Sequence, residues 1–233
     1  MYRRIMGSLL LLAIGSSINV NAQTSTIAPA TGVPGKVISM EPTTADEIKT
    51  FLQGGRWVSI TPEVRPGGSK STDGTIQPTY CLREFVYLPD DRFVCKFTTY
   101  ADPNAKVPLI RFVIKGHLKW EGDHPIARGA QKVDYVADES YEATPMIQAV
   151  ADALNKAPVD GVNKWEVNVM QDLKGKAFPA FGLLEPKTYV DYDLIYIHYG
   201  MLFNGSKNVD GRPFNKPENR PTNLQIPLER QPG

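Results

Sequence analysis

The sequence predicts a mainly β fold, in which a curved antiparallel sheet forms a barrel or half-barrel with one or two flanking helices. Three observations support this prediction. Residues 109–120 alternate apolar and polar side chains over an unusually long run, several further segments have strand character, and only two short segments have clear helical periodicity.

The first helix is expected directly after Thr44. Thr44 and Glu47 have the spacing of a capping box, in which each side chain accepts a hydrogen bond from the other residue's backbone N–H group. Three apolar residues then share one helical face, and two glycines follow them: Ile48, Phe51 and Leu52, then Gly54-Gly55.

Strands are expected at residues 56–64, 79–88, 92–100, 109–120, 126–136 and 188–198, with shorter ones at 202–203 and 223–228. Residues 66–71 are expected to form a hairpin loop. In the strand at 109–120 the even positions are apolar, and Gly116 is the expected bend.

The segments 79–88 and 92–100 should pair around Asp90-Asp91, which places Cys81 opposite Tyr100. Cys81 and Cys95 are then offset by about 16 Å along the strands, too far for a disulfide.

A second helix is expected to begin at Thr144, with Pro145 in its first turn. Its apolar stripe consists of Met146, Ile147, Val150 and Leu154. Residues 165–173 fit either a helix or a strand, and residues 208–221 are expected to form a loop rich in proline, asparagine and glycine.

The N-terminal segment resembles an export signal. Arg3 and Arg4 precede an apolar stretch, and the small residue Ala22 offers a cleavage site before Gln23. We therefore expect a signal peptide at 1–22, a disordered linker at 23–43 and one domain at 44–230. The mature protein is expected to be periplasmic or secreted, with no membrane-spanning segment.

The charge balance disfavours a highly charged partner. The whole chain has 26 basic and 25 acidic residues, and removal of the signal peptide leaves 24 and 25. A mature chain with a net charge near zero is not expected to bind nucleic acid or an anionic membrane surface.

Few residues suggest catalysis or metal binding. The three histidines lack metal-ligand spacing, although Glu121, Asp123 and His124 form a small polar cluster that more often is a solvated turn. Asp191 and Asp193 share one strand face, where paired carboxylates can perform acid–base catalysis, but a solvent-facing edge is the more ordinary interpretation. Because no nucleophile, phosphate-binding or dinucleotide motif occurs, we predict no enzyme, no cofactor and no metal.

Several short motifs together resemble one known family. They are Gly55-Arg56-Trp57-Val58-Ser59, Glu63-Val64-Arg65, Leu82-Arg83-Glu84-Phe85, Tyr100-Ala101-Asp102-Pro103, Arg128-Gly129-Ala130, Leu202-Phe203-Asn204-Gly205 and Lys216-Pro217-Glu218-Asn219-Arg220-Pro221-Thr222. In this order they resemble the adenomatosis polyposis coli down-regulated 1 family, over about residues 54 to 230.

The resemblance implies a half-open, lipocalin-like antiparallel β-barrel with a hydrophobic pocket. Animal members of the family are extracellular Wnt antagonists, and their pocket is implicated in holding the Wnt acyl chain. This sequence departs from them: Thr61-Pro62 and Ala105 stand where the family has cysteines, and the chain has one copy of the domain. The pocket is therefore the property expected to be shared.

Our functional hypothesis is a non-enzymatic binding domain for a lipid, an acyl chain or another apolar ligand, including one carried by an acylated protein. The expected pocket residues are Phe112, Ile114, Leu118 and Tyr196, with Arg65, Arg83 or Arg128 at a polar mouth. Two alternatives stay open. The apolar faces can form a solid core in a protein-interaction domain, or Asp191 and Asp193 can serve a hydrolase-like enzyme.

Overall fold

A computed structural model describes residues 41–232 of the chain, except residues 71 and 209–211. The predicted signal peptide at 1–22, and the predicted linker up to residue 40, lie outside the described residues. In the described part the fold is mainly β and antiparallel with two α-helices, so the predicted fold class is confirmed.

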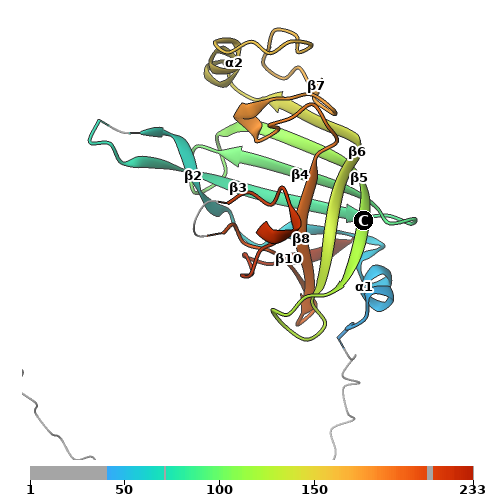
Figure 1. Ribbon diagram of the computed structural model, residues 1–233. Helices are drawn as coiled ribbons and strands as arrows, with labels where there is room; N and C mark the ends of the chain where they lie inside the picture. Colours follow the sequence, from blue (N-terminus) through green and yellow to red (C-terminus); the bar gives the residue numbers. More distant parts are fainter. Residues whose placement is uncertain (1–40, 71, 209–211, 233) are drawn as a thin grey trace, which may run out of the picture. The chain divides into compact units, whose positions relative to one another are not determined.

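Within the described residues, ten strands form one sheet whose two ends meet (Figure 1). The order is β1-β10-β9-β8-β6-β5-β4-β3-β2, and β1 also pairs with β3. Hydrogen bonds therefore link eight strands in a ring, while β2 and β7 pair at its side. The strands are β1 (Gly55–Ser59), β2 (Glu63–Lys70), β3 (Ile76–Tyr87), β4 (Arg92–Tyr100), β5 (Pro108–Asp123), β6 (Gln131–Pro145), β7 (Gln171–Asp172), β8 (Val190–His198), β9 (Met201–Asn204) and β10 (Leu228–Pro232).

The two α-helices are α1 (Ala45–Leu52) and α2 (Gln148–Asn155), and two short 3₁₀ turns are η1 (Pro179–Phe181) and η2 (Pro217–Asn219). Figure 1 shows α2 and β7 at one end of the long strands, the β5–β6 loop at the other end, and the β2–β3 hairpin projecting sideways. The capping box of α1 is confirmed, because the Thr44 Oγ1 atom accepts from the Glu47 amide and Glu47 accepts from the Thr44 amide.

Two predicted element boundaries near the N-terminal end were wrong. The strand at 56–64 is divided into β1 and β2 around Thr61-Pro62, because proline lacks the amide donor that a continuous ladder needs. Residues 66–70, predicted as a hairpin loop, belong to β2, and the turn to β3 follows them.

The strand that follows β5 was also misplaced. It was predicted at 126–136, whereas β6 runs from Gln131 to Pro145 and a loop occupies residues 124–130. Thr144 does not cap a helix: it pairs with Arg111 in the sheet, and α2 begins only after Ile147. Here, pairing with the long strand β5 outweighs the local preference for a helix cap.

Smaller differences occur in the C-terminal half. Within residues 165–173 only β7 has regular structure, and the last strand is β10 at 228–232 rather than a strand at 223–228. The strand predicted at 188–198 is confirmed as β8.

The hairpin of β3 and β4 is present, but its predicted register was wrong by one residue. Cys81 pairs with Thr99 and Cys95 with Phe85, because the turn has three residues rather than two. Asp90 and Asp91 both adopt positive φ in that turn. In this register the two cysteines are not bonded to each other.

Gly116 marks an irregularity between β5 and β6, as predicted for a bend. Lys115 pairs with Ser140 and His117 with Val136, so three residues of β6 lie opposite Gly116. A Cβ atom at Gly116 would lie 1.9 Å from the Val136 carbonyl oxygen, so only glycine fits this bulge.

Side chains on the inner face of the ring form two packed clusters. The α1 cluster includes Ile48, Leu52, Trp57, Phe93, Leu118 and Leu228. The α2 cluster includes Phe112, Tyr141, Ala151, Trp165, Phe178 and Leu183. Each cluster is completed by one helix, so the two ends of the ring interior are filled by different parts of the chain.

Candidate functional site

Between the two clusters, two inward-facing apolar side chains remain incompletely covered. Phe97 and Ile114 pack against both clusters, yet both are only half-buried. Their neighbours on the same strand face, Cys95 on β4 and Phe112 on β5, are buried. The middle of the inner face is therefore less tightly closed than either end.

The bulge opposite Gly116 brings the start of β8 to this place. β6 pairs with β8 through residues 131–136 and with β7 through residues 142–143, so the bulge separates the two partners. Within the bulge, the Ala137 amide donates to the Tyr189 carbonyl oxygen over 2.9 Å. This bond fixes Tyr189 just before β8 begins.

Two carboxylates of β8 face the interior rather than solvent. Asp191 pairs with Tyr135, and Asp193 pairs with Val133, whose side chains belong to the α1 cluster. Since directly paired residues share a sheet face, both carboxylates lie on the inner face. The interpretation of this pair as a solvent-facing edge was wrong. The outward side chains of β8 are those at the even positions, which alternate with Asp191 and Asp193.

Asp193 is held by the backbone. Its Oδ1 atom accepts from the Leu194 amide over 2.7 Å and from the Gly205 amide over 2.8 Å. Burial raises the pKa of Asp193, while these two amide bonds and the charges of Arg83 and Arg220 act in the opposite direction. We therefore assign the ionised form of the pair to Asp193.

Asp191 has much weaker support. The Tyr189 hydroxyl donates to its Oδ1 atom over 3.4 Å, and Oδ2 has no hydrogen-bond partner among the described residues. Burial, followed by the negative charge of Asp193, raises the pKa of Asp191 to about 8. At neutral pH the Asp191 carboxyl group is therefore predominantly protonated and can donate a hydrogen bond.

Tyr141 places a second unsatisfied polar group nearby. Its ring packs edge-on against Tyr189, with 5.7 Å between ring centroids, and it pairs with Ile114 across the sheet. The residue is only 5% exposed, and its hydroxyl group has no hydrogen-bond partner in the described part of the chain. Burial, followed by the charge of Asp191, raises the pKa of Tyr141, so its hydroxyl stays neutral.

These unsatisfied atoms remain accessible. In the part of the chain that the structure describes, Arg111 Nε is the one fully enclosed side-chain nitrogen or oxygen atom without a partner. The Tyr141 hydroxyl and Asp191 Oδ2 are therefore not fully enclosed. We call the group formed by Phe97, Ile114, Tyr141, Tyr189 and Asp191 the mid-ring site. It combines half-buried apolar surface with two neutral, unpaired hydrogen-bonding groups.

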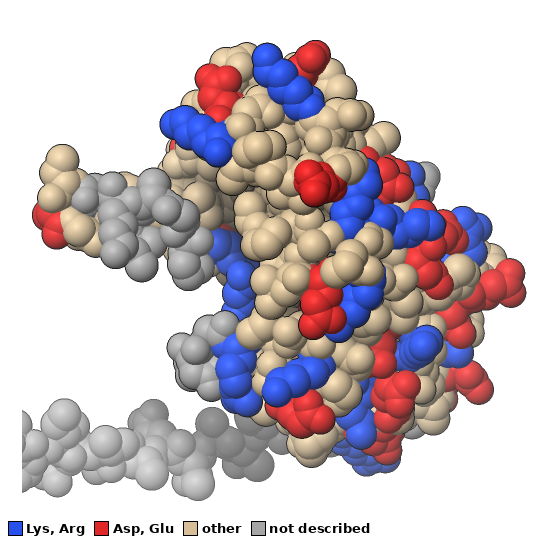
Figure 2. Space-filling model, turned by 45° about the horizontal axis from the view of Figure 1, so that its top comes forward, with Lys and Arg blue, Asp and Glu red and all other residues tan. Residues whose placement is uncertain are grey.

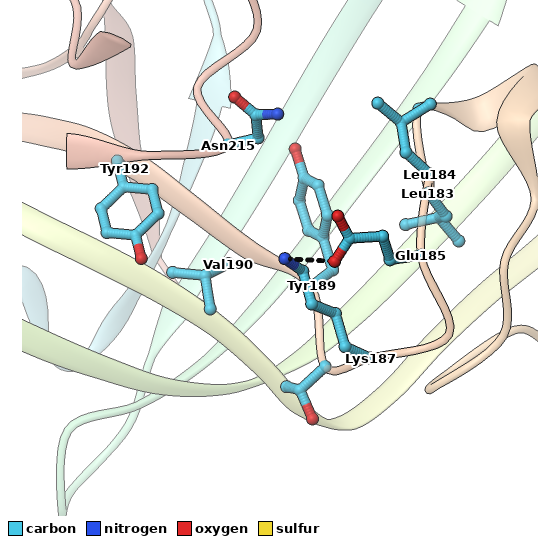
Figure 3. Close-up of a pocket in the computed structure, with 10 residues that line it drawn as sticks. Leu183, Leu184, Glu185, Lys187, Tyr189, Val190, Tyr192 and Asn215 are labelled. Carbon is cyan, nitrogen blue, oxygen red and sulfur yellow. Dashed lines mark ion pairs between the residues drawn. The ribbon is translucent and has the colours of Figure 1, made fainter. Parts of the chain in front are cut away.

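A surface pocket of about 240 Å³ adjoins the mid-ring site. Figure 3 shows the Tyr189 ring between Val190 and Tyr192 on one side and Leu183 and Leu184 on the other, with the Glu185–Lys187 ion pair at the rim. Tyr189 thus lines this pocket and also contacts Asp191 and Tyr141. It is the residue shared by the outer pocket and the inner face.

The four predicted pocket residues lie in different parts of the structure. Ile114 belongs to the mid-ring site, and Phe112 lies beside it, stacked on Phe97 at 4.6 Å and 5% exposed. Leu118 is packed in the α1 cluster. Tyr196 does not join them: it alternates with the inward Ile195 and Ile197 and stacks on His198 on the other face of β8.

The three predicted mouth arginines also lie in different places. Arg83 faces inward and is 7% exposed, and it donates to Glu63 and Asn204 and to the Ile226 carbonyl oxygen, which links β3 to the opposite side of the ring. Arg65 donates to Glu63 and Gln225. Arg128 is exposed on the β5–β6 loop, at the far end of β5 from Ile114. Arg83 and Arg65 thus both form structural ion pairs with Glu63.

Two of the five mid-ring residues were not singled out from the sequence. Tyr141 was missed because β6 was expected to end before it. Tyr189 lies within the strand predicted at 188–198, but the prediction chose the opposite face, that of Tyr196, as the inner one. Phe97 shares its strand face with Phe93 and Cys95, an alternation that is visible in the sequence. A signal for Tyr141 existed in the polar–apolar alternation of residues 140–143, but the helix signal at Thr144 masked it.

No protein-family model matches the chain. Within the described residues, no helix is long and apolar enough to cross a bilayer, and no group of three or more histidine, cysteine, aspartate or glutamate side chains could hold a metal ion.

Proposed function

We propose that this chain is an exported binding domain that holds an apolar ligand, such as an acyl chain, against the inner face of the ring at the mid-ring site. The observation that carries the proposal is the incomplete burial of Phe97 and Ile114 between two filled clusters. Apolar surface left accessible on an otherwise packed inner face is favourable for an apolar ligand to cover.

The energetic scale fits a small amphiphile. Each buried methylene group contributes about 0.8 kcal/mol, so a chain of medium length reaches about micromolar affinity after the cost of association. The surface pocket beside Tyr189 offers additional space for the same ligand. The resemblance to the adenomatosis polyposis coli down-regulated 1 family supports an acyl ligand, whereas the Wnt-antagonist role of that family is not part of the proposal.

The molecular surface agrees with a ligand of low charge. On the face drawn in Figure 2, Lys and Arg side chains are interspersed with Asp and Glu side chains. A surface of this kind does not provide the extended basic footprint of a protein that binds nucleic acid.

The experiment is to purify the exported protein and search for a co-purified small molecule by native mass spectrometry. The protein is then titrated with a fluorescent fatty acid. We expect a bound apolar molecule, or saturable binding of the probe at one site. If neither is found, the domain does not hold an apolar ligand, and a protein-interaction role with a solid core becomes the better account.

A further inference from the structure

We infer that the ligand of the mid-ring site has an uncharged hydrogen-bonding end group, such as a hydroxyl group, which contacts the Tyr141 hydroxyl and the Asp191 carboxyl. This inference rests on the proposed function and adds to it the chemistry of the ligand's polar end.

The geometry supports a polar contact inside the ring. Tyr141 is 5% exposed and comes from β6, whereas Asp191 comes from β8, and the Tyr189 side chain touches both. Both groups keep hydrogen-bonding capacity that no residue of the described chain uses, and a polar partner from outside the chain can meet it. Ile114 pairs directly with Tyr141, which puts apolar surface next to the polar groups.

The charges around Asp191 favour a neutral end group over an ionised carboxylate. Asp193 lies two residues away on the same strand face, and its ionised carboxylate repels a second anion. The titratable and charged groups that influence Asp191 or share its surroundings come from several elements. They are Asp193 and Tyr189 next to it in the chain, Tyr135 and Tyr141 of β6, Cys95 of β4, Arg83 of β3, and Lys207 and Arg220, the two cations with the largest effect on Asp191. The two cations act on Asp191 less strongly than Asp193 does.

A cationic end group gains attraction from the ionised Asp193 carboxylate, but that carboxylate already accepts two amide hydrogen bonds. The ammonium group would also lose its hydration beside apolar side chains, which a neutral end group does not face to the same extent. A hydroxyl group needs no change of charge, because it can accept from one neutral partner and donate to the other.

The test compares ten-carbon ligands that differ only in the end group. Decan-1-ol, decanoate and decylamine are titrated into the protein by calorimetry at neutral pH. We expect decan-1-ol to bind most tightly. Tighter binding of decanoate or decylamine would overturn the inference while leaving the proposed apolar site intact. Absence of binding by all three ligands would remove the proposed function, and this inference with it.

Two variants locate the polar contact. Tyr141→Phe removes the hydroxyl group and keeps the ring, so it should weaken decan-1-ol binding about three- to tenfold, the usual effect of one neutral hydrogen bond. Binding of decane, measured by competition, should not change. Equal loss for both ligands, or no loss for the alcohol, contradicts the inference.

The second variant, Asp191→Asn, keeps a neutral hydrogen-bonding group of the same shape but cannot ionise, so its binding of decan-1-ol is compared with that of the wild type across pH. Wild-type affinity for the alcohol should change as the pH rises past about 8, because Asp191 then changes from a hydrogen-bond donor to an acceptor, whereas the variant should show no such change. The same pH dependence in both proteins would exclude Asp191 from the contact.

Discussion

The Tyr189 hydroxyl group lies 3.4 Å from Oδ1 of Asp191. Among the described residues, no other side chain forms a hydrogen bond with that carboxyl group. Tyr189 precedes β8 by one residue, and Asp191 is the second residue of that strand. The contact therefore depends on the start of β8 being held in place by the bulge in β6. It leaves an inward-facing acid with one weak partner, and this arrangement has consequences for both stability and binding.

Asp191→Asn should stabilise the folded protein more at high pH than at low pH. The pKa of Asp191 is about 8 in the folded chain and about 3.9 in an unfolded chain. Because the pKa is raised in the folded chain, the protonated group makes its full contribution to the free energy of unfolding below about pH 4. This contribution is lost as the pH rises toward 8. Asparagine does not titrate.

We expect the variant to exceed the wild type in free energy of unfolding by at least about 1.4 kcal/mol at about pH 8, the equivalent of one pKa unit, and by less at about pH 5. Urea unfolding at both pH values measures this difference. The exposed residue Asp160 provides the control Asp160→Asn. A difference that does not depend on pH would contradict the placement of Asp191.

Gly116→Ala should be strongly destabilising. The new Cβ atom would lie 1.9 Å from the Val136 carbonyl oxygen, so β5 and β6 must separate to admit it. We expect a loss of about 2–4 kcal/mol, measured by thermal or urea unfolding. Gly122→Ala is not a suitable control because Gly122 has positive φ. Lys119→Ala, at an exposed position of the same strand, is suitable, and similar losses for both variants would count against the bulge.

Arg83→Met should leave the buried Glu63 carboxylate with Arg65 as its remaining ion-pair partner. Glu63 is 3% exposed and receives a 2.6 Å hydrogen bond from Arg83 Nε. Loss of one partner of a buried pair costs about 3–5 kcal/mol, and the double variant Arg83→Met/Glu63→Gln should recover part of it. Arg128→Met, at an exposed position, should have little effect on the unfolding midpoint. No recovery in the double variant would mean that Arg83 acts mainly through Asn204 and the Ile226 carbonyl.

Local patterns in the sequence predict much of this fold. The capping box at Thr44, the alternation of residues 109–120 and the strand at 188–198 each depend on a few neighbouring residues. The incorrect boundaries depend on distant partners. Thr144 has the chemistry of a helix cap, yet pairing with Arg111 in the long β5–β6 ladder keeps it in a strand.

The candidate site was harder to predict for the same reason. Ile114 was identified because its strand alternates clearly. The inward direction of Asp191 could not be read from β8 alone, because each side of its alternation mixes apolar and polar residues. One side combines aspartates with isoleucines, and the other combines valine and leucine with tyrosines and a histidine. It is set by the register that pairs Asp191 with Tyr135. Tyr196 was misplaced by the same ambiguity, since a tyrosine suits an inner face or a stacked outer face equally well.

The most direct measurement of the central claim is ligand binding by Ile114→Trp beside Val113→Trp. Ile114 faces the inner side and pairs with Tyr141, whereas Val113 faces the opposite side and pairs with Lys96 and Glu142. Both variants are melted and titrated with the same fluorescent fatty acid. We predict that Ile114→Trp stays folded and loses the probe, while Val113→Trp binds it as the wild type does. If the core is solid, tryptophan at position 114 would overpack it and lower the free energy of unfolding by about 1–3 kcal/mol. Equal binding of the probe by Ile114→Trp and the wild type would contradict the site.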